Sequence, residues 1–228
     1  MSEPPKDLRL WRLPRGRHGL PRELVERSQR ERLLAAVVRV SAAKGYEATS
    51  VADVLAEAGV GRESFYELFS DKQDCMLAAR QLLVEDLEAT IAGAYTAPAP
   101  WLDRVRETLA ATLGWFAADP IAGRVMLLEL AALGPISRSI FLEDFERFSR
   151  LLEPGIDEIG GPPDVPGATG LAVGATFARI YDQIARDRAA QLPGMVPEMT
   201  YEVLVPFIGE ARAREQERRA RALEPSSA

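Results

Sequence analysis

Residues 59–73, GVGRESFYELFSDKQ, carry side chains that can hydrogen-bond to DNA. Phe65 and Phe69 lie one helical turn apart and are expected to face a core, which leaves Arg62, Ser64 and Tyr66 facing outward. Guanidinium and hydroxyl groups contact bases and phosphates in protein–DNA complexes. The pattern therefore predicts a helix that lies in a DNA groove.

Glu63 stands among these groups and has two interpretations. A carboxylate near a helix N-terminus is favoured by the helix dipole, and it can accept a hydrogen bond from the amino group of cytosine. Alternatively, Glu63 points to solvent or holds Arg62. Glu67, one turn later, is expected to face away from the groove.

The charge of the chain is unevenly distributed, although its net value is −6. Residues 1–44 hold eleven Lys and Arg against five Asp and Glu, whereas residues 45–72 hold two against six. A polyanion responds to the local field, so a basic head on an acidic body can still bind nucleic acid. Arg15 and Arg17 are predicted to follow the DNA backbone or enter a minor groove. The alternative is a merely solvated basic tail.

Composition excludes several function classes. Cys75 and His18 are the only cysteine and the only histidine, so neither a disulfide framework nor a histidine–cysteine metal cluster can form. No glycine-rich phosphate loop or catalytic grouping is present, and we expect no enzyme activity, no cofactor and no metal. No apolar run has the length of a signal peptide or a membrane helix, which predicts a cytoplasmic protein.

Periodicity predicts an all-α chain of about nine helices. The expected helices cover about 22–44, 50–58, 62–68, 71–95, 101–118, 120–133, 136–153, 169–190 and 198–220. Capping boxes are expected at SVAD (50–53) and SDKQ (70–73), and Pro206 should kink the last helix. The segment 155–167 is too rich in glycine and proline for regular structure.

These elements suggest a division of the chain into an N-terminal DNA-binding domain and a C-terminal helical domain. The predicted segments are a flexible basic arm (1–20), a three-helix helix-turn-helix domain (21–70), a connecting helix (71–95), a ligand-binding and dimerisation domain (96–222) and a disordered tail (223–228). Gly59 in the AGVG turn can adopt a left-handed backbone, as the turn between the two short helices requires. The second of these helices can then enter the major groove.

Residues 44–79 resemble the DNA-binding domain of the tetracycline-repressor (TetR) family. The motif residues, in order and spacing, are Gly45, Tyr46, Thr49, Ser50, Val51, Val54, Leu55, Ala58, Gly59, Val60, Phe65, Tyr66, Phe69 and Lys72. The chain departs from the family pattern at Gly61, Glu63, Ser64 and Leu68. The resemblance therefore supports DNA binding and leaves open which DNA is bound.

The resemblance implies phosphate contacts for Tyr66 and Lys72. Ser50 begins a helix whose N-terminus can bind an anion, and Thr49 is a weaker candidate for the same contact. Arg62 and Ser64 are the expected base or phosphate contacts of the reading helix.

The resemblance also implies an effector pocket and a dimer interface in the C-terminal domain. Candidate pocket residues are Trp101, Trp115, Phe116, Met126, Phe141, Phe145, Phe177 and Tyr181. Gly170, Gly174 and Ala178 share one helix face, where another helix could approach closely. Segments 169–190 and 198–215 are assigned to a four-helix dimer seam, because two reading helices roughly 34–36 Å apart can read a palindrome together.

The sequence thus predicts a homodimeric repressor that a small apolar or aromatic effector releases from a palindromic operator in double-stranded DNA. Two alternatives remain: a helix-turn-helix adaptor that binds a protein partner, and an activator of the same family.

Overall fold

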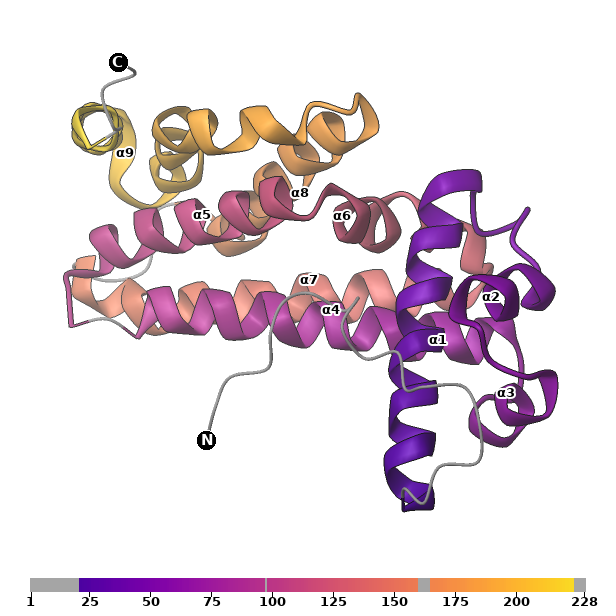
Figure 1. Ribbon diagram of the computed structural model, residues 1–228. Coiled ribbons are helices and arrows are strands. Elements are labelled where there is room, and N and C mark those ends of the chain that lie inside the picture. Colours follow the sequence, from indigo (N-terminus) through magenta and orange to yellow (C-terminus); the bar gives the residue numbers. More distant parts are fainter. Residues whose placement is uncertain (1–20, 97, 160–164, 224–228) are drawn as a thin grey trace. The chain divides into compact units, whose positions relative to one another are not determined.

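The computed structural model describes residues 21–96, 98–159 and 165–223. All regular structure in these residues is helical, with nine α-helices and three short 3-10 helices, η1 to η3. The predicted all-α fold is confirmed. The chain forms two compact units, residues 1–83 and 84–228, whose boundary falls inside helix α4 (Lys72–Tyr95) (Figure 1).

The N-terminal unit contains α1 (Arg22–Lys44), α2 (Val51–Ala58), α3 (Arg62–Leu68) and the first part of α4. Helices α2 and α3 both pack against α1 (Figure 1). The core that they enclose is apolar and nearly inaccessible to water; its members include Leu33, Leu34, Val37, Val54, Phe65, Phe69, Met76 and Ala79. A helix as short as α2 or α3 is not stable alone in water, so this shared core is what holds both of them.

The capping box at the start of α2 is confirmed. The Ser50 side chain accepts a hydrogen bond from the Asp53 backbone N–H at 3.2 Å, and the Asp53 carboxylate accepts one from the Ser50 N–H at 2.8 Å. Lys44 lies 2.6 Å from the same carboxylate. Hydrogen bonds from Lys44 and then from Ser50 hold the pKa of Asp53 far below its ordinary value.

The second capping box was predicted one residue too early. Asp71, not Ser70, accepts the hydrogen bond from inside α4, from the Asp74 N–H at 2.8 Å. Asp74, not Gln73, reaches back, and its carboxylate accepts from the Ser70 N–H at 2.9 Å. An ionised carboxylate is a stronger acceptor than a hydroxyl or an amide, and the helix dipole favours negative charge at this end.

The C-terminal unit contains the rest of α4 and all later elements. They are α5 (Trp101–Ala118), α6 (Pro120–Leu127), η1 (Glu129–Leu133), α7 (Ile136–Leu152), η2 (Glu153–Ile159), α8 (Ala168–Ala185), η3 (Ala189–Met195) and α9 (Val196–Ala222). Three expectations need correction. The helix expected at 120–133 ends at Leu127, part of the expected irregular loop forms η2, and α8 stops at Ala185 instead of 190.

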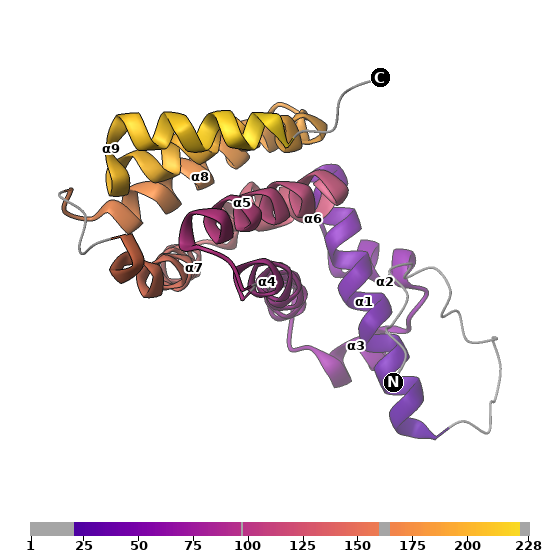
Figure 2. The ribbon, with the colours of Figure 1, turned by 90° about the vertical axis from the view of Figure 1, so that its left-hand side faces the viewer.

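The last helix reverses direction at Gly209 and not at Pro206. Gly209 has φ 73° and ψ 167°, which a residue with a side chain rarely adopts, whereas Pro206 lies inside the helical part. Beyond Gly209 the chain folds back, and the Arg214 guanidinium lies 4.0 Å from the centre of the Tyr201 ring. Figure 2 shows the two halves of α9 side by side. The segment 198–215 is therefore not one continuous helix.

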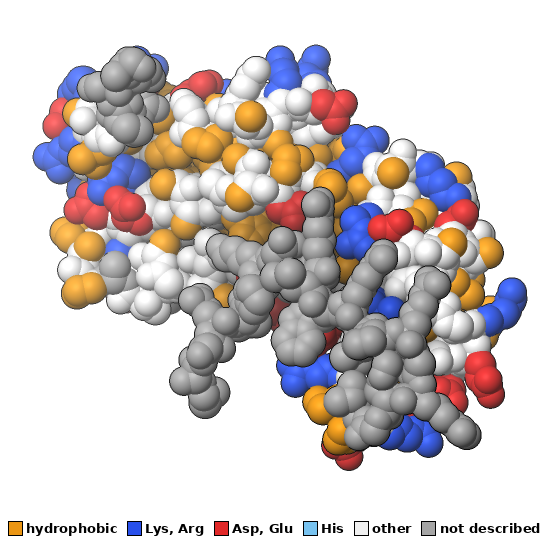
Figure 3. Space-filling model, viewed as in Figure 1, with side chains coloured by type: hydrophobic (Ala, Val, Ile, Leu, Met, Phe, Trp, Pro, Cys, Tyr) orange, Lys and Arg blue, Asp and Glu red, His pale blue; other side chains and the backbone are white. Residues whose placement is uncertain are grey.

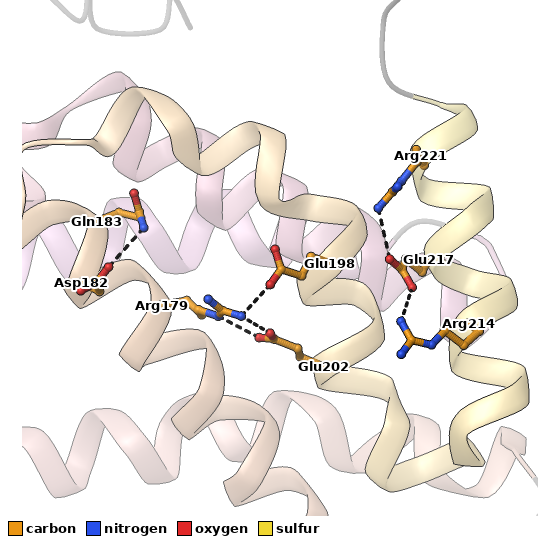
Figure 4. Close-up of polar contacts among 8 residues, drawn as sticks. All are labelled: Arg179, Asp182, Gln183, Glu198, Glu202, Arg214, Glu217 and Arg221. Atoms are coloured by element: carbon orange, nitrogen blue, oxygen red, sulfur yellow. Dashed lines mark hydrogen bonds and ion pairs between the residues drawn. The ribbon is translucent and has the colours of Figure 1, made fainter.

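Ion pairs hold α8 against the first half of α9 (Figure 4). Arg179 of α8 lies 2.7 Å from Glu198 and also binds Glu202 on the same face of α9. The hydrogen bonds that Arg179 donates to these carboxylates raise its pKa, and the bond to Glu202 has the largest effect. Arg179 is part-exposed, so we regard these pairs as fixing helix register more than adding stability.

The two glycines of α8 allow a close helix approach, as predicted, whereas Ala178, expected on the same face, is exposed. A Cβ atom added at Gly170 would lie 3.5 Å from Cζ of Phe145 in α7, and one added at Gly174 would lie 3.9 Å from Cε2 of the same ring. The helix that approaches this face is α7 of the same chain.

Candidate nucleic-acid interface

Helix α3 divides its side chains between the core and the surface as the sequence predicts. Phe65 and Phe69 are 0% and 4% exposed, and their ring centres lie 5.8 Å apart. Arg62, Glu63 and Tyr66 are exposed, Tyr66 by 48%. The buried pair fixes the rotation of the helix, so these three side chains form an outward surface on one short element.

Arg62 and Tyr66, both on the outward side of α3, contact each other. The Arg62 guanidinium carbon lies 5.6 Å from the centre of the Tyr66 ring, and the Tyr66 ring meets Phe65 edge-on at 5.2 Å. Such cation–π contacts restrict an otherwise mobile side chain. Arg62 is thus presented on a surface that is anchored to the core through Phe65.

Ser64 is directed toward α1 and is less exposed than its neighbours. Its hydroxyl oxygen accepts a hydrogen bond from the Gln29 side-chain amide at 3.4 Å. Glu67 is exposed, and its charge helps to raise the pKa of Arg22 after the larger contributions of Glu26. The hydrogen bond with Gln29 separates Ser64 from the outward set.

The turn between α2 and α3 is held by a side chain that was not predicted. Gly59 is left-handed, with φ 61° and ψ 39°, as expected for this turn. Arg32 of α1 donates from Nη1 to the carbonyl oxygens of Ala58 and Gly59 at 3.2 and 3.3 Å. The last carbonyls of a helix lack partners within it, and the helix dipole favours a cation there.

The two predicted contacts at the start of α2 differ in accessibility. Ser50 is exposed. Its hydroxyl donates a hydrogen bond to the Asp53 carboxylate and accepts one from the Asp53 backbone N–H. Thr49 is only 3% exposed, and its hydroxyl donates to the Gly45 carbonyl oxygen at 2.8 Å. The structure therefore places the Thr49 side chain inside the loop and not on the surface with Ser50.

The Lys72 ammonium binds the backbone of the loop between α1 and α2. Its Nζ donates to the carbonyl oxygens of Tyr46 and Thr49 at 2.8 and 2.7 Å, and lies 4.0 Å from the centre of the Tyr46 ring. Burial lowers the pKa of Lys72 below its ordinary value. At least two of its three N–H donors are thus used within the protein.

Charges of both signs are interspersed over the N-terminal unit on the face shown in Figure 3. Surface pairs such as Arg39–Glu57, at 2.7 Å, bring opposite charges together. The arm residues Arg15 and Arg17, which were predicted to contact DNA, lie outside the described residues.

Sequence reasoning missed Gln29 and Arg32, which contact the reading helix and its turn from α1. A weak signal was available, because Ser28, Arg32 and Ala36 follow one another at helical spacing on a helix with a buried stripe. Nothing local could indicate that the partners would be residues 58, 59 and 64.

The predicted effector residues fall into two groups in the C-terminal unit. Trp101, Phe116 and Met126 are buried, and Trp101 meets Phe207 of α9 edge-on at 5.3 Å. Trp115 donates from its ring nitrogen to Asp86 at 2.6 Å.

The second group is a ladder of aromatic rings between α7 and α8. Phe141 contacts both Phe145 and Phe177, at 6.2 and 5.2 Å between ring centres, and Phe177 contacts Tyr181 at 6.1 Å. Phe141 and Tyr181 are 38% and 43% exposed. The structure thus gives the eight candidates two different environments, a core and a partly exposed surface.

Within the described residues, no helix is long and apolar enough to cross a membrane. The same residues hold no group of three or more His, Cys, Asp or Glu side chains placed to bind a metal ion.

Comparison with known proteins finds a family model that matches part of the chain. Residues 33–79 match the sequence model of bacterial regulatory proteins of the tetR family. No curated protein matches the chain in sequence.

Solved structures share the fold at low sequence identity. The fatty acid degradation regulator FadR from Bacillus halodurans has a TM-score of 0.68 and 19% identity, over 78% of this chain and 94% of that one. A putative TetR-family transcriptional regulator from Syntrophomonas wolfei has a TM-score of 0.66 and 21% identity, over 79% and 95%. FadR from Bacillus subtilis, solved in complex with stearoyl-CoA, has a TM-score of 0.63 and 18% identity, over 78% and 97%.

The match covers α2, the turn, α3 and the start of α4, which are the elements that present Arg62, Glu63 and Tyr66. Residues 33–79 therefore carry the sequence pattern of the tetR family of bacterial regulatory proteins, and the chain shares the fold of solved structures that include a putative TetR-family regulator.

Proposed function

We propose that the protein is a homodimeric repressor that binds a palindromic operator through α3 and leaves it when a small apolar effector binds the C-terminal unit. The observation that carries the DNA-binding part is the division of α3 between Phe65 and Phe69 in the core and Arg62, Glu63 and Tyr66 on the surface. In a helix-turn-helix protein, such an outward face enters the major groove.

Within this proposal, Arg62 and Glu63 face base edges and Tyr66 contacts a phosphate. Ser50, exposed at the N-terminus of α2, lies at a second place where a phosphate can approach amide groups. Arg15 and Arg17 add charge from the arm that precedes α1. The protein acts on DNA in the cytoplasm.

An apolar stripe on α8 supports the homodimer. The exposed side chains of α8 are Leu171, Ala178, Tyr181 and Ala185, separated by seven, three and four positions. This spacing puts them on one face, and Leu171 is 54% exposed. The free face of a helix in a monomeric protein is normally polar, so an apolar one is best explained by a second copy of the chain.

The aromatic ladder and the buried rings of the C-terminal unit are suited to an apolar effector. The similar fold of a regulator solved with stearoyl-CoA makes long acyl thioesters the first class to test. A ligand releases DNA only to the extent that it binds the two states of the protein differently.

Selection from a random duplex library tests the function. We expect enrichment of a two-fold symmetric sequence with half-sites one helical turn apart, bound more weakly as salt rises. Stearoyl-CoA, with coenzyme A alone as the control, is then added to the complex, and release by the acyl form only is expected. If the folded protein enriches no sequence at moderate salt, the DNA-binding proposal is wrong; an enriched sequence without symmetry contradicts the dimeric operator.

Glu63 provides a test of base reading. If its carboxylate accepts a hydrogen bond from a cytosine, Glu63→Ala should change the selected base at one position of each half-site, with a loss of about 1–3 kcal/mol of discrimination there. Glu67→Ala is the matched control, because it removes the carboxylate one turn further along α3, and it should leave the selected sequence unchanged. An identical selected sequence for Glu63→Ala and the wild type means that Glu63 reads no base.

A further inference from the structure

Helix α2 has eight residues and is followed by the turn that sets the direction of α3, the proposed reading helix. A helix of this length is not stable alone, so its position depends on tertiary contacts, both those of its buried Val54 and those at its two ends. The last carbonyl oxygens of α2 have no partner within the helix. The loop before α2 also presents backbone carbonyl oxygens, those of Tyr46 and Thr49.

Two cations from other helices bind these carbonyl oxygens. At the end of α2, Arg32 of α1 donates to Ala58 and Gly59. Before its start, Lys72 of α4 donates to Tyr46 and Thr49. The contacts join residues 23 to 27 positions apart in the sequence, and therefore tie α1 and α4 to the two ends of α2.

The geometry at Lys72 is the better defined of the two. Both of its hydrogen bonds are shorter than 3 Å, and the face of the Tyr46 ring lies against the same ammonium. Tyr46 is itself 7% exposed, so the ring is fixed in the core. Two of the three N–H donors of Lys72 are thus used within the protein, which leaves at most one for a phosphate.

We propose that Lys72 and Arg32 are positioning residues of the DNA-binding unit, which hold the backbone at the two ends of α2 and so set the place of α3, and that Lys72 does this instead of contacting a phosphate. The predicted effect on DNA binding rests on the proposed function. The hydrogen bonds of Lys72 and Arg32 to the backbone, together called the clamp, exist in the free protein. Because Lys72 is the first residue of α4, it makes the start of that helix part of the DNA-reading unit.

The salt dependence of DNA binding distinguishes a clamp from a phosphate contact. Removing one phosphate contact lowers the slope of log affinity against log salt by about 0.9, whereas a displaced α2 leaves the number of neutralised phosphates unchanged. Lys72→Met keeps the apolar stem and removes the ammonium. We expect about tenfold weaker binding to the selected operator with the wild-type slope, and the same for Arg32→Met.

Tyr46→Leu is the second variant, and it applies where Lys72→Met fails to fold. It removes the ring under the ammonium and changes no charge, so a clamp predicts weaker operator binding with the wild-type slope. Arg62→Met is the matched control, an exposed cation of α3 with its guanidinium over Tyr66. A fall in slope of about 0.9 for Lys72→Met, or an unchanged affinity for both Lys72→Met and Tyr46→Leu, overturns the proposal.

Amide hydrogen exchange of the full chain without DNA tests the clamp separately from the function. Exchange at the amides of residues 51–60 should be at least tenfold faster in Lys72→Met than in the wild type, and unchanged in Arg62→Met. Unchanged exchange in Lys72→Met overturns the clamp whether or not DNA binding is found. Faster exchange together with no DNA binding by the wild type supports the clamp and refutes the proposed function.

Discussion

Phe65→Ala should destabilise the N-terminal unit by about 3–5 kcal/mol and abolish DNA binding. Phe65 is 0% exposed and contacts both Tyr66 and Phe69, so its removal leaves a cavity beneath the reading helix. Whole domains are stable by only about 5–15 kcal/mol, and this loss is a large share of that. Urea unfolding followed by circular dichroism measures it.

Tyr66→Ala is the matched control for this prediction, because it removes a similar ring from the next position. Tyr66 is 48% exposed, and we expect its removal to leave stability within about 1 kcal/mol of the wild type while weakening binding to all DNA sequences alike. A loss of less than about 1 kcal/mol for Phe65→Ala would show that α3 is not anchored by this ring.

The two substitutions also separate the two faces of α3. If Phe65 anchors and Tyr66 contacts DNA, the first variant loses stability and binding together, and the second loses binding alone. The reverse pattern contradicts the assignment of the outward face.

Leu171→Glu should convert the protein to a monomer and weaken operator binding on the order of a hundredfold. Joining two binding modules strengthens binding by roughly 10²–10⁴, and that gain is lost when the modules separate. Leu171 is 54% exposed, so a glutamate there should not disturb the fold of one chain, but it would place a charge inside the proposed dimer face. Light scattering coupled to size exclusion measures the mass, and fluorescence anisotropy measures the affinity.

Leu223→Glu is the matched control, since Leu223 is 65% exposed at the end of α9 and outside the apolar stripe of α8. It should stay dimeric and bind the operator as the wild type does. If Leu171→Glu remains a dimer with unchanged affinity, the α8 face is not the dimer interface.

The Gly209 reversal changes which surfaces are available to such a dimer. The second half of α9 packs back along the first and buries Ala213, Gln216 and Ala220. Part of the segment 198–215 is therefore used within the chain. The exposed stripe of α8 remains the best supported part of the predicted seam.

The sequence by itself determined the features that depend on residues close together in the chain. The Ser50–Asp53 capping box, the left-handed Gly59 and the alternation of Phe65 and Phe69 with outward side chains all follow from separations of one to four positions. Local geometry fixes such contacts wherever the helix lies. The same locality explains why the bounds of α1 and α3 were predicted correctly.

Only the tertiary structure decided the partners of the polar side chains that bind residues far away in the sequence. Lys72 has the residue type of a surface contact, yet it binds backbone carbonyl oxygens 23 and 26 positions away, and Gln29 reaches Ser64 across 35 positions. Such pairings depend on how helices cross, which periodicity does not specify. A buried donor also takes a carbonyl whenever one is near, because leaving either group unsatisfied costs about 1–3 kcal/mol. The packing of α1, α2 and α4 thus assigns these side chains roles that their types alone could not show.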